Sequence, residues 1–582
     1  MTKRGILFLL LASALSAQTR NIDDFFRDFT AEWVRGNPSQ ATSTRYFTGE
    51  EQDRLERQLT PVTEAYKRAR IQLARKGLAE LRQFDRSQLT ETQRLSADVM
   101  QWQLETIAGE EPFLDFTFPL EQMNGANVTL IETLTVRHPL ASEKDAVNYV
   151  AALGQVGARM DEAIAEMRKQ AAKNIIPPRF ILKATIRQMQ SFADPAPAQN
   201  PFVTTMVQKM EAVKSIPEPR RAELAGQAEK IVATQIYPAW KRGIALLESE
   251  LPRSTDEAGI SRFKDGDKAY AFFLHRFTTT NLTAEQIHQV GLDEVARLEK
   301  QMDTVFRSLG RTEGSIQERT EKLKQDLAYP RTEEGRKMIM ADADTILRDA
   351  EKRAAALFDK TPKSRVIVQP FPRFREGNAA ANYNRPAPDG SRPGVIQIPL
   401  RPEQMTKFAL RSLIYHEGVP GHHFDGATET ENQDVPRFRQ IRAFGNIAAR
   451  GEGWGLYAER LAAESGWYDG DPEGLLGQLN DALWRARRLV VDTGLHSQHW
   501  TRQQAIDYGI ETSEVERYVV FPGQACSYMI GQLKIVELRE KARKALGGKF
   551  SLREYHNLVL NTGTVPLDVL ERQVDAWIKK QL

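Results

Sequence analysis

Long segments without the alternation of a β-strand favour a mainly helical fold for this 582-residue chain. They cover residues 51–84, 91–108, 141–174, 219–251, 284–308 and 332–358. Several helix starts have the spacing of a capping box, in which a Ser or Thr precedes a Gln or Glu by three residues. These pairs are Thr90 and Gln93, Thr283 and Gln286, Thr501 and Gln504, and Ser551 and Glu554. We therefore expect a large fold built mostly from capped helices.

Strand-like composition is confined to a short region in the second half of the chain. Arg365–Val368 and Gly394–Leu400 are rich in β-branched residues, and both come before a histidine-rich segment at 416–423. We expect a small sheet with one edge along a cleft, where an extended peptide can add as a further strand. Asn382–Asn384 and the Pro/Gly-rich turn at 386–394 are expected to form the loop between the two strands.

The length of the chain predicts more than one lobe. We expect residues 18–330 to form an N-terminal helical lobe and residues 331–582 a C-terminal lobe that carries the functional site. Lys and Arg total 80 against 77 Asp and Glu, an excess too small to indicate nucleic-acid binding. The sole cysteine, Cys526, cannot form an internal disulfide and is expected to be a small packed residue.

Residues 1–17 have the three parts of a secretory signal. Met1–Arg4 is basic, Ile6–Leu11 is apolar, and Ala12–Ala17 consists largely of small residues. The apolar run is too short to span a bilayer, so we expect cleavage between Ala14 and Gln18. The sequence thus predicts export to the periplasm or the extracellular space, with no membrane insertion after cleavage. Because no cysteine lies in this segment, we expect no lipid anchor.

Residues 416–423 read His-Glu-Gly-Val-Pro-Gly-His-His, a stretched relative of the His-Glu-x-x-His zinc motif. Pro420 stands where the second ligand of the ordinary motif would be. In an unbroken helix, the side chain of His422 points away from that of His416, and His423 lies roughly 10 Å further along the axis. A two-residue bulge at Pro420 and Gly421 can bring His422 to the metal. We prefer His422 as the second ligand and keep His423 as the alternative.

The residues before the motif follow one helical stripe that ends at His416: Met405, Phe408, Ala409 and Ser412. His416 should therefore face the interior. The alternative is an ordinary helix end closed by Pro and Gly, with histidines near the negative end of the helix dipole.

A third ligand is expected from Glu452 or Glu459, which are seven residues apart and share one helix face. One can bind the metal while the other accepts a hydrogen bond from a ligating imidazole. We place Glu452 first because the flanking glycines permit close approach to a metal. The alternative is a pair of solvated helix glutamates.

Further candidates lie in the last hundred residues and near the strands. His496, on a helical run with Asp492 and His499, and Tyr528 can donate hydrogen bonds to a developing oxyanion. Arg517 can pair with a substrate carboxylate or form a surface salt bridge with Glu514 or Glu516. Tyr383 and His423 are candidates for contacts with the metal ligands or the substrate. For His496 and Tyr528, a purely structural hydrogen bond is at least as common as a catalytic one.

Five sequence blocks resemble the bacterial family catalogued as domain of unknown function 885. They are FPLEQMNG (118–125), HEGVPGHHF (416–424), EGWGLYAE (452–459), RLVVDTGLH (488–496) and PGQACSYMIG (522–531). That family in turn resembles the zincin metallopeptidases, especially the mostly helical oligopeptidases and carboxypeptidases. The resemblance implies a zinc ion (Zn²⁺) bound by His416, His422 and Glu452. It also implies Glu417 as the general base, and short peptides as substrates that enter a cleft between helical lobes.

The sequence therefore predicts a metallopeptidase-like hydrolase with a large helical zincin-like fold. One alternative is a metal-dependent amidase that acts on non-peptide substrates, because the same site can cleave any accessible amide. Another is a peptide-binding protein without catalytic activity, although a binder has no need of the base Glu417. The oligomeric state and the choice between endo- and exopeptidase action stay open at this point.

Overall fold

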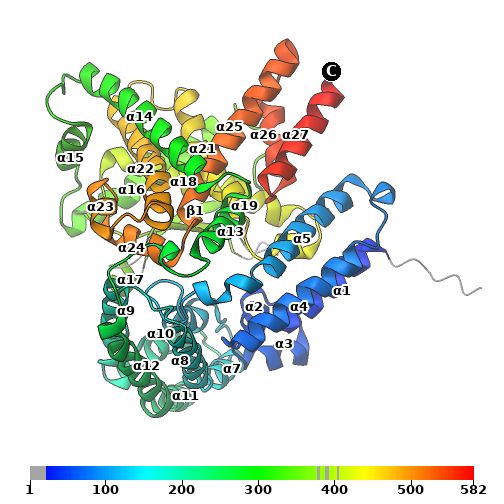
Figure 1. Ribbon diagram of the computed structural model, residues 1–582, viewed down its shortest axis with the longest axis vertical. Helices are drawn as coiled ribbons and strands as arrows, with labels where there is room; N and C mark the ends of the chain where they lie inside the picture. Colours follow the sequence, from blue (N-terminus) through cyan, green and yellow to red (C-terminus); the bar gives the residue numbers. More distant parts are fainter. Residues whose placement is uncertain (1–20, 372, 377–379, 387–391, 403–404) are drawn as a thin grey trace, which may run out of the picture.

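The protein is mainly helical, and it contains a small sheet beside the histidine-rich segment. The computed structural model describes residues 21–371, 373–376, 380–386, 392–402 and 405–582. Figure 1 shows a helical body built largely from the second half of the chain, a smaller helical lobe beneath it and the N-terminal helices along one side. The predicted secretory signal, residues 1–17, lies outside the described residues.

The N-terminal helices pack against the C-terminal half of the chain. In α1, Phe29 and Trp33 recur at helical spacing, and Asn21 caps the first turn by accepting a hydrogen bond from the Asp23 backbone N–H at 3.1 Å. Phe29 stacks on Phe444, with ring centroids 5.7 Å apart. The helices of this region are α1 (Ile22–Arg35), α2 (Pro38–Thr44), α3 (Gly49–Glu56), α4 (Glu64–Leu81) and α5 (Glu91–Gly109). The division of the chain at residue 330 stays a prediction, and this hydrophobic core crosses it.

The lower lobe in Figure 1 has a hydrophobic core of its own, which includes the fully buried Trp240. The expected helical segments 141–174 and 219–251 are present, but each is interrupted. The first breaks at Gly154 and Gln155, and the second contains a π-helical turn at Val232–Ile236. The helices are α6 (Ala126–Glu132), α7 (Glu143–Leu153), α8 (Val156–Ala172), α9 (Arg179–Ala193), α10 (Pro201–Glu211), α11 (Glu218–Ile231) and α12 (Tyr237–Glu250).

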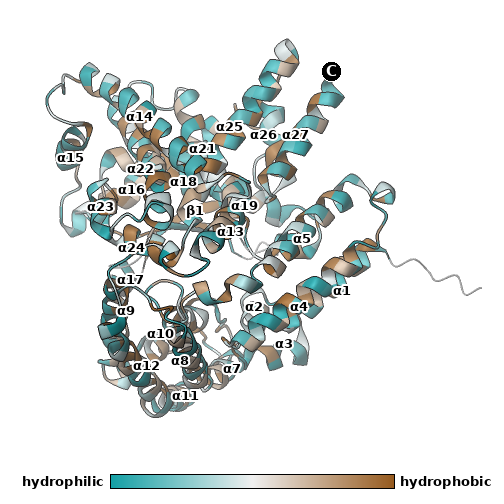
Figure 2. Cartoon of the chain, viewed as in Figure 1, coloured by the Kyte–Doolittle hydropathy of each residue, from teal (hydrophilic) through white to brown (hydrophobic). Residues whose placement is uncertain are grey.

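The next helices return the chain to the body. They are α13 (Gly266–Thr278), α14 (Ala284–Ser308), α15 (Ile316–Asp326) and α16 (Glu333–Ala354). The predicted segment 284–308 coincides with α14. The capping boxes predicted at Thr90, Thr283 and Thr501 are present. At Ser551 only half of the box forms, because its hydroxyl accepts a hydrogen bond from the Glu554 N–H without the reciprocal bond. In Figure 2, hydrophobic and hydrophilic residues alternate along single helices, as expected for helices with one face packed on a core.

The described residues form a three-stranded sheet in the order β1-β3-β2. The strands are β1 (Val366–Pro370), β2 (Asn382–Asn384) and β3 (Gly394–Ile398), and the short helix α17 (Arg373–Glu376) follows β1. The central strand β3 pairs in parallel with β1 and antiparallel with β2. The prediction of a loop at Asn382–Asn384 is therefore wrong. This segment pairs with β3 although it has no β-branched residue, because strand pairing depends on the neighbouring strand as well as on composition.

The remaining helices surround the functional site. They are α18 (Lys407–Glu417), α19 (His422–Glu431), α20 (Arg437–Gln440), α21 (Ala448–Glu464), α22 (Pro472–Ser497), α23 (Arg502–Asp507), α24 (Thr512–Val520), α25 (Ser527–Leu546), α26 (Leu552–Thr562) and α27 (Leu567–Gln581). Helices α18, α21 and α22 pack against one another, and α21 also packs along α25. None of the helices in the described part of the chain is long and apolar enough to cross a membrane.

Candidate metal centre

The histidine-rich segment breaks its helix, and this break brings two imidazoles together. Helix α18 ends at Glu417, and α19 begins at His422 after a four-residue turn. The prediction of a bulge inside one helix is therefore wrong, although its consequence for His422 is the same. A Cβ atom at Gly421 would lie 2.0 Å from the carbonyl oxygen of His416, so this tight turn requires a glycine. The rings of His416 and His422 meet edge-on, with centroids 4.7 Å apart.

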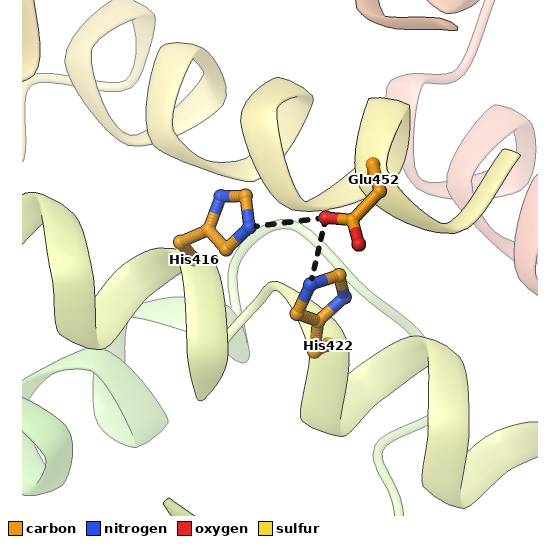
Figure 3. Close-up of side chains that lie close together, drawn as sticks. All are labelled: His416, His422 and Glu452. Atoms are coloured by element: carbon orange, nitrogen blue, oxygen red, sulfur yellow. Dashed lines mark ion pairs between the residues drawn. The ribbon is translucent and has the colours of Figure 1, made fainter. Parts of the chain in front are cut away.

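Glu452 of α21 completes a cluster of three metal-binding side chains (Figure 3). Its Oε2 lies 3.7 Å from Nε2 of His416 and 3.4 Å from Nε2 of His422. One ligand atom from each of the three residues lies within 4.8 Å of the others. Two imidazoles and one carboxylate, with a position left for water or substrate, are the donor set of many catalytic zinc sites. The residues therefore fit a zinc ion.

The other ring nitrogen of His416 is held by a buried carboxylate. Its Nδ1 lies 2.6 Å from Oε1 of Glu459, whose Oε2 accepts a hydrogen bond from the Ser412 hydroxyl at 2.7 Å. The Glu459 side chain is fully buried. With a proton on Nδ1 held by Glu459, Nε2 is the ring nitrogen that faces Glu452 and is left to bind a metal, which is the arrangement that orients a zinc-binding histidine.

The charges of the cluster favour a cation at its centre. Burial alone would lower the pKa of His416, but Glu452 and Glu459 outweigh it and raise the pKa to about 9. Burial likewise opposes ionisation of Glu452, yet the two imidazoles hold its pKa below the usual value. The carboxylates thus stabilise positive charge between the two rings, either as protons or as a bound metal ion.

Glycines in the segment Gly451–Gly455 of α21 allow this helix to lie close to α18 and α25. A Cβ at Gly455 would lie 2.7 Å from Cε1 of His416, and one at Gly453 would lie 2.6 Å from the Cα of Gly531 on α25. Gly451 has open space beside it. Gly453 and Gly455 thus serve helix packing and Gly451 does not, whereas the sequence suggested that the glycines beside Glu452 allow close approach to the metal.

The three candidate ligands open into a cavity of about 570 Å³. Glu417 lines this cavity and is 8% exposed to solvent. Burial raises the pKa of Glu417, partly offset by His422 and His416. A carboxylate with a raised pKa beside a metal site is suited to accept a proton from water and to release it later. Tyr528 also lines the cavity, and burial together with Glu452 raises its pKa, so its hydroxyl keeps its proton and can donate it in a hydrogen bond.

His423 and Tyr383 form a pair beside the metal cluster. The Tyr383 hydroxyl, carried by β2, lies 3.0 Å from Nδ1 of His423. Burial lowers the pKa of His423 to about 4, so its ring is neutral near pH 7. His423 is absent from the three-residue cluster and from the described cavity wall, whereas Tyr383 lines the cavity. The geometry therefore favours His422 as the second ligand.

The structure does not bring His496 to the cavity. Its ring is fully buried, Nδ1 accepts a hydrogen bond from the Ile260 N–H at 3.1 Å, and Nε2 lies 3.0 Å from the carbonyl oxygen of Tyr518. With both ring nitrogens bound to backbone groups, the assignment of His496 as an oxyanion donor is wrong. The neighbouring Asp492 accepts hydrogen bonds from the Tyr270 hydroxyl at 2.6 Å and the Gly523 N–H at 2.9 Å, so it is also structural.

Arg517 lies in the cavity wall and forms the alternative salt bridge with Glu514, although the Arg517 side chain is largely buried and not at the helix surface. It is 8% exposed, donates to Glu514 at 2.8 Å and to the Gln524 side chain at 2.5 Å. Glu516 pairs instead with Arg502, at 2.6 Å. Cys526 is fully buried, as predicted.

Sequence reasoning missed two arginines of α22 that line the cavity, Arg485 and Arg488. Arg485 lies 3.5 Å from Glu459, and Arg488 donates to Glu514 at 3.0 Å. A signal for them exists in the sequence. They are three residues apart, on one face of a helix, among the apolar residues Ala482, Leu483, Ala486 and Leu489.

Comparisons with known proteins identify a family and two similar solved structures. The family model described as "Bacterial protein of unknown function (DUF885)" matches residues 38–574. A candidate lipoprotein from Colwellia psychrerythraea has 30% sequence identity and a TM-score of 0.91, and the match covers 96% of this chain and 100% of that one. A candidate lipoprotein of unknown function from Shewanella oneidensis shares the fold, with 16% identity, a TM-score of 0.70 and coverage of 95% and 99%. Comparison with curated proteins gives no match.

Proposed function

The chain belongs to this bacterial family of unknown function 885, and we propose that it is a zinc-dependent hydrolase of peptide bonds. The observation that carries the proposal is the convergence of His416, His422 and Glu452 beside Glu417 in one cavity. The hydrogen bond that Glu459 accepts from His416 adds to it, because helix-surface glutamates have no reason to be fully buried against an imidazole.

In this proposal His416, His422 and Glu452 hold the ion, and residues of the cavity carry the proton transfers. When bound, zinc acts as a Lewis acid on a carbonyl oxygen and lowers the pKa of water toward about 7. The Glu417 carboxylate accepts the proton of the attacking water and passes it to the leaving amine. The Tyr528 hydroxyl donates a hydrogen bond to the oxygen on which negative charge develops.

The fold proposed for this function is that of a helical zincin-like metallopeptidase. A helix that carries His-Glu, a following helix that carries a glutamate ligand and a small sheet alongside are features that support it. The edge strand β2 contributes Asn382 and Tyr383 to the cavity wall. An extended substrate can pair with such an edge through its backbone. We therefore infer short, unfolded peptides as substrates.

We further propose that the protein is exported, to the periplasm or beyond. The basic, apolar and small-residue parts of residues 1–17 support this, and both solved relatives are described as candidate lipoproteins. Export would place the cavity among peptides outside the cytoplasm.

A peptide-library digest tests the proposal. The mature protein, residues 18–582, is loaded with about one zinc per chain and incubated with a mixture of unstructured peptides, and mass spectrometry identifies the products. We expect cleavage that a chelator abolishes and added zinc restores. Hydrolysis of non-peptide amides alone would show an amidase. Peptide binding without any hydrolysis would show a binding protein, and either result would refute the proposal.

A further inference from the structure

The cavity has a second charged region, formed by Arg488 and Arg517. The side chain of Arg488 is 4% exposed and that of Arg517 is 10% exposed. Both guanidinium groups donate to the same carboxylate, Glu514, at 3.0 Å and 2.8 Å. Two positive charges thus share one negative charge, which leaves a net positive charge in a place with little contact to water.

Arg488 has hydrogen-bonding capacity that the described residues do not use. Its Nη2 donates to Glu514, but Nε and Nη1 are buried and have no hydrogen-bond partner in the described part of the chain. The guanidinium carbon lies 3.8 Å from the ring centroid of Trp484 and 4.6 Å from that of Tyr528. The contacts of the Arg488 guanidinium with these two aromatic rings offset part of the cost of burying its charge. They leave the Nε and Nη1 donors without a hydrogen bond.

A buried cation with unused donors in the wall of a ligand cavity points to an anionic group on the ligand. Guanidinium groups pair preferentially with carboxylates and phosphates, and the substrates proposed here are peptides, which carry carboxylates. Arg485, one turn away, already has Glu459 at 3.5 Å and Asp481 at 3.7 Å as counter-ions. Among these three arginines, the excess positive charge therefore lies at Arg488 and Arg517, which share one counter-ion.

We propose that Arg488, with Arg517, binds the C-terminal carboxylate of the peptide, so that the protein removes residues from the C-terminal end of its substrates. This inference rests on the proposed peptidase function and specifies its substrate class. The terminal carboxylate fits better than an acidic side chain, because every peptide has one whatever its sequence.

Binding measurements on a slow variant test the inference without requiring turnover. The zinc-loaded Glu417→Gln protein is titrated by calorimetry with four N-acetylated tripeptides. Two end in Ala and two in Glu, and one of each pair has a free carboxylate while the other has a C-terminal amide. We expect the free acids to bind about 10- to 100-fold more tightly than the amides, whichever residue is last.

Substitutions at Arg487 and Arg488 then show which arginine is responsible for the preference for the free acid. Arg488→Gln should abolish the preference for the free acid and leave amide binding and zinc content unchanged, and Arg488→Lys should keep part of the preference. Arg487→Gln is the matched control, because Arg487 is the next residue of α22 but pairs with Glu299 at 3.1 Å, outside this cavity. Zinc content and thermal unfolding of each variant show that the fold is retained.

Equal binding of acids and amides, or binding of neither, overturns the inference. So does an acid preference that persists in Arg488→Gln. A preference for Glu over Ala at the last position of the amides would assign the arginines to an acidic side chain and overturn it as well. If Arg488→Gln does not fold, the acid–amide comparison in the parent protein decides. Tighter binding of acids by a wild-type protein that hydrolyses no amide would leave the carboxylate site standing and refute the peptidase function alone.

Discussion

Replacing Glu459 by Gln tests whether the hydrogen bond between Glu459 and His416 increases the affinity of the site for zinc. The substitution keeps the size of the side chain and removes the charge that lies 2.6 Å from Nδ1 of His416. The imidazole then becomes a weaker base at Nε2, and a carboxylate partner of this kind contributes about 10- to 100-fold in metal affinity. We therefore expect zinc affinity to fall by that factor, which corresponds to about 1.4–2.7 kcal/mol.

The Glu459 carboxylate also contacts Arg485 and Ser412, so the thermal stability of the variant must be measured as well as its zinc affinity. Arg485 lies 3.5 Å from Glu459 and keeps only Asp481, at 3.7 Å, as a buried counter-ion after the change. The Ser412 hydroxyl can still donate to the glutamine oxygen. We expect a lower unfolding temperature together with a protein that remains folded at 25 °C, where the affinity is measured.

Competition between the protein and a chromophoric chelator gives the zinc affinity. Glu464→Gln is the matched control, because Glu464 lies on the same helix but pairs with Arg460 at 2.7 Å and Arg539 at 2.6 Å. Zinc affinity in Glu459→Gln equal to that of the wild type would refute the role assigned to Glu459. An equal loss in Glu464→Gln would show that the effect comes from general destabilisation of α21.

Further predictions concern the base, the oxyanion donor, the second ligand and the pH dependence of stability. Glu417→Gln should keep zinc and lose about 10²- to 10⁴-fold in hydrolysis under single-turnover conditions. Tyr528→Phe should lower kcat by about 10²- to 10³-fold with zinc content unchanged. His422→Ala should lose zinc on dialysis, whereas His423→Ala should lose at most about 10- to 100-fold in affinity. Burial lowers the pKa of His496 to about 4 from its usual value of 6.5. Its neutral ring therefore contributes stability above about pH 6.5 that is lost as the pH falls toward 4. Urea unfolding at about pH 7.5 and about pH 5 should show about 2 kcal/mol more destabilisation in the wild type than in His496→Gln.

Each of these predictions has an outcome that contradicts it. Unchanged turnover in Glu417→Gln would mean that another group activates the water. A full rate in Tyr528→Phe would make this tyrosine a structural residue. Loss of zinc from His423→Ala but not from His422→Ala would reverse the ligand assignment. An identical pH dependence in the wild type and His496→Gln would show that the buried ring does not stay neutral on folding.

Features set by local sequence could be predicted, because they depend on periodicity and capping within one segment. Helix α14 occupies the predicted residues 284–308, and the capping boxes at Thr283 and Thr501 form as expected. The joint appearance of Glu452 and Glu459 on one face of α21 also follows from helical periodicity alone. These local features supply two of the carboxylates around His416.

Features that depend on distant parts of the chain could not be predicted. The strand at Asn382–Asn384 exists because β3 lies beside it. His496 and Arg488 lie on the same helix, α22. Only the fold shows that backbone groups enclose the His496 ring and that the Arg488 side chain lines the cavity. Pro420 and Gly421 predict a bulge inside one helix, but the structure has a break after Glu417, whose form depends on how α19 packs against α21. Tertiary packing, and not periodicity, decides such positions.

The position of a bound metal ion tests the central claim most directly. Crystals of the zinc-loaded protein, measured above and below the zinc absorption edge, locate the ion through its anomalous scattering. We predict one strong site per chain, about 2.0–2.2 Å from Nε2 of His416, Nε2 of His422 and a carboxylate oxygen of Glu452. An ion bound at His423, or zinc-loaded protein without any anomalous peak between these three residues, would contradict the metal centre and the hydrolase mechanism built on it.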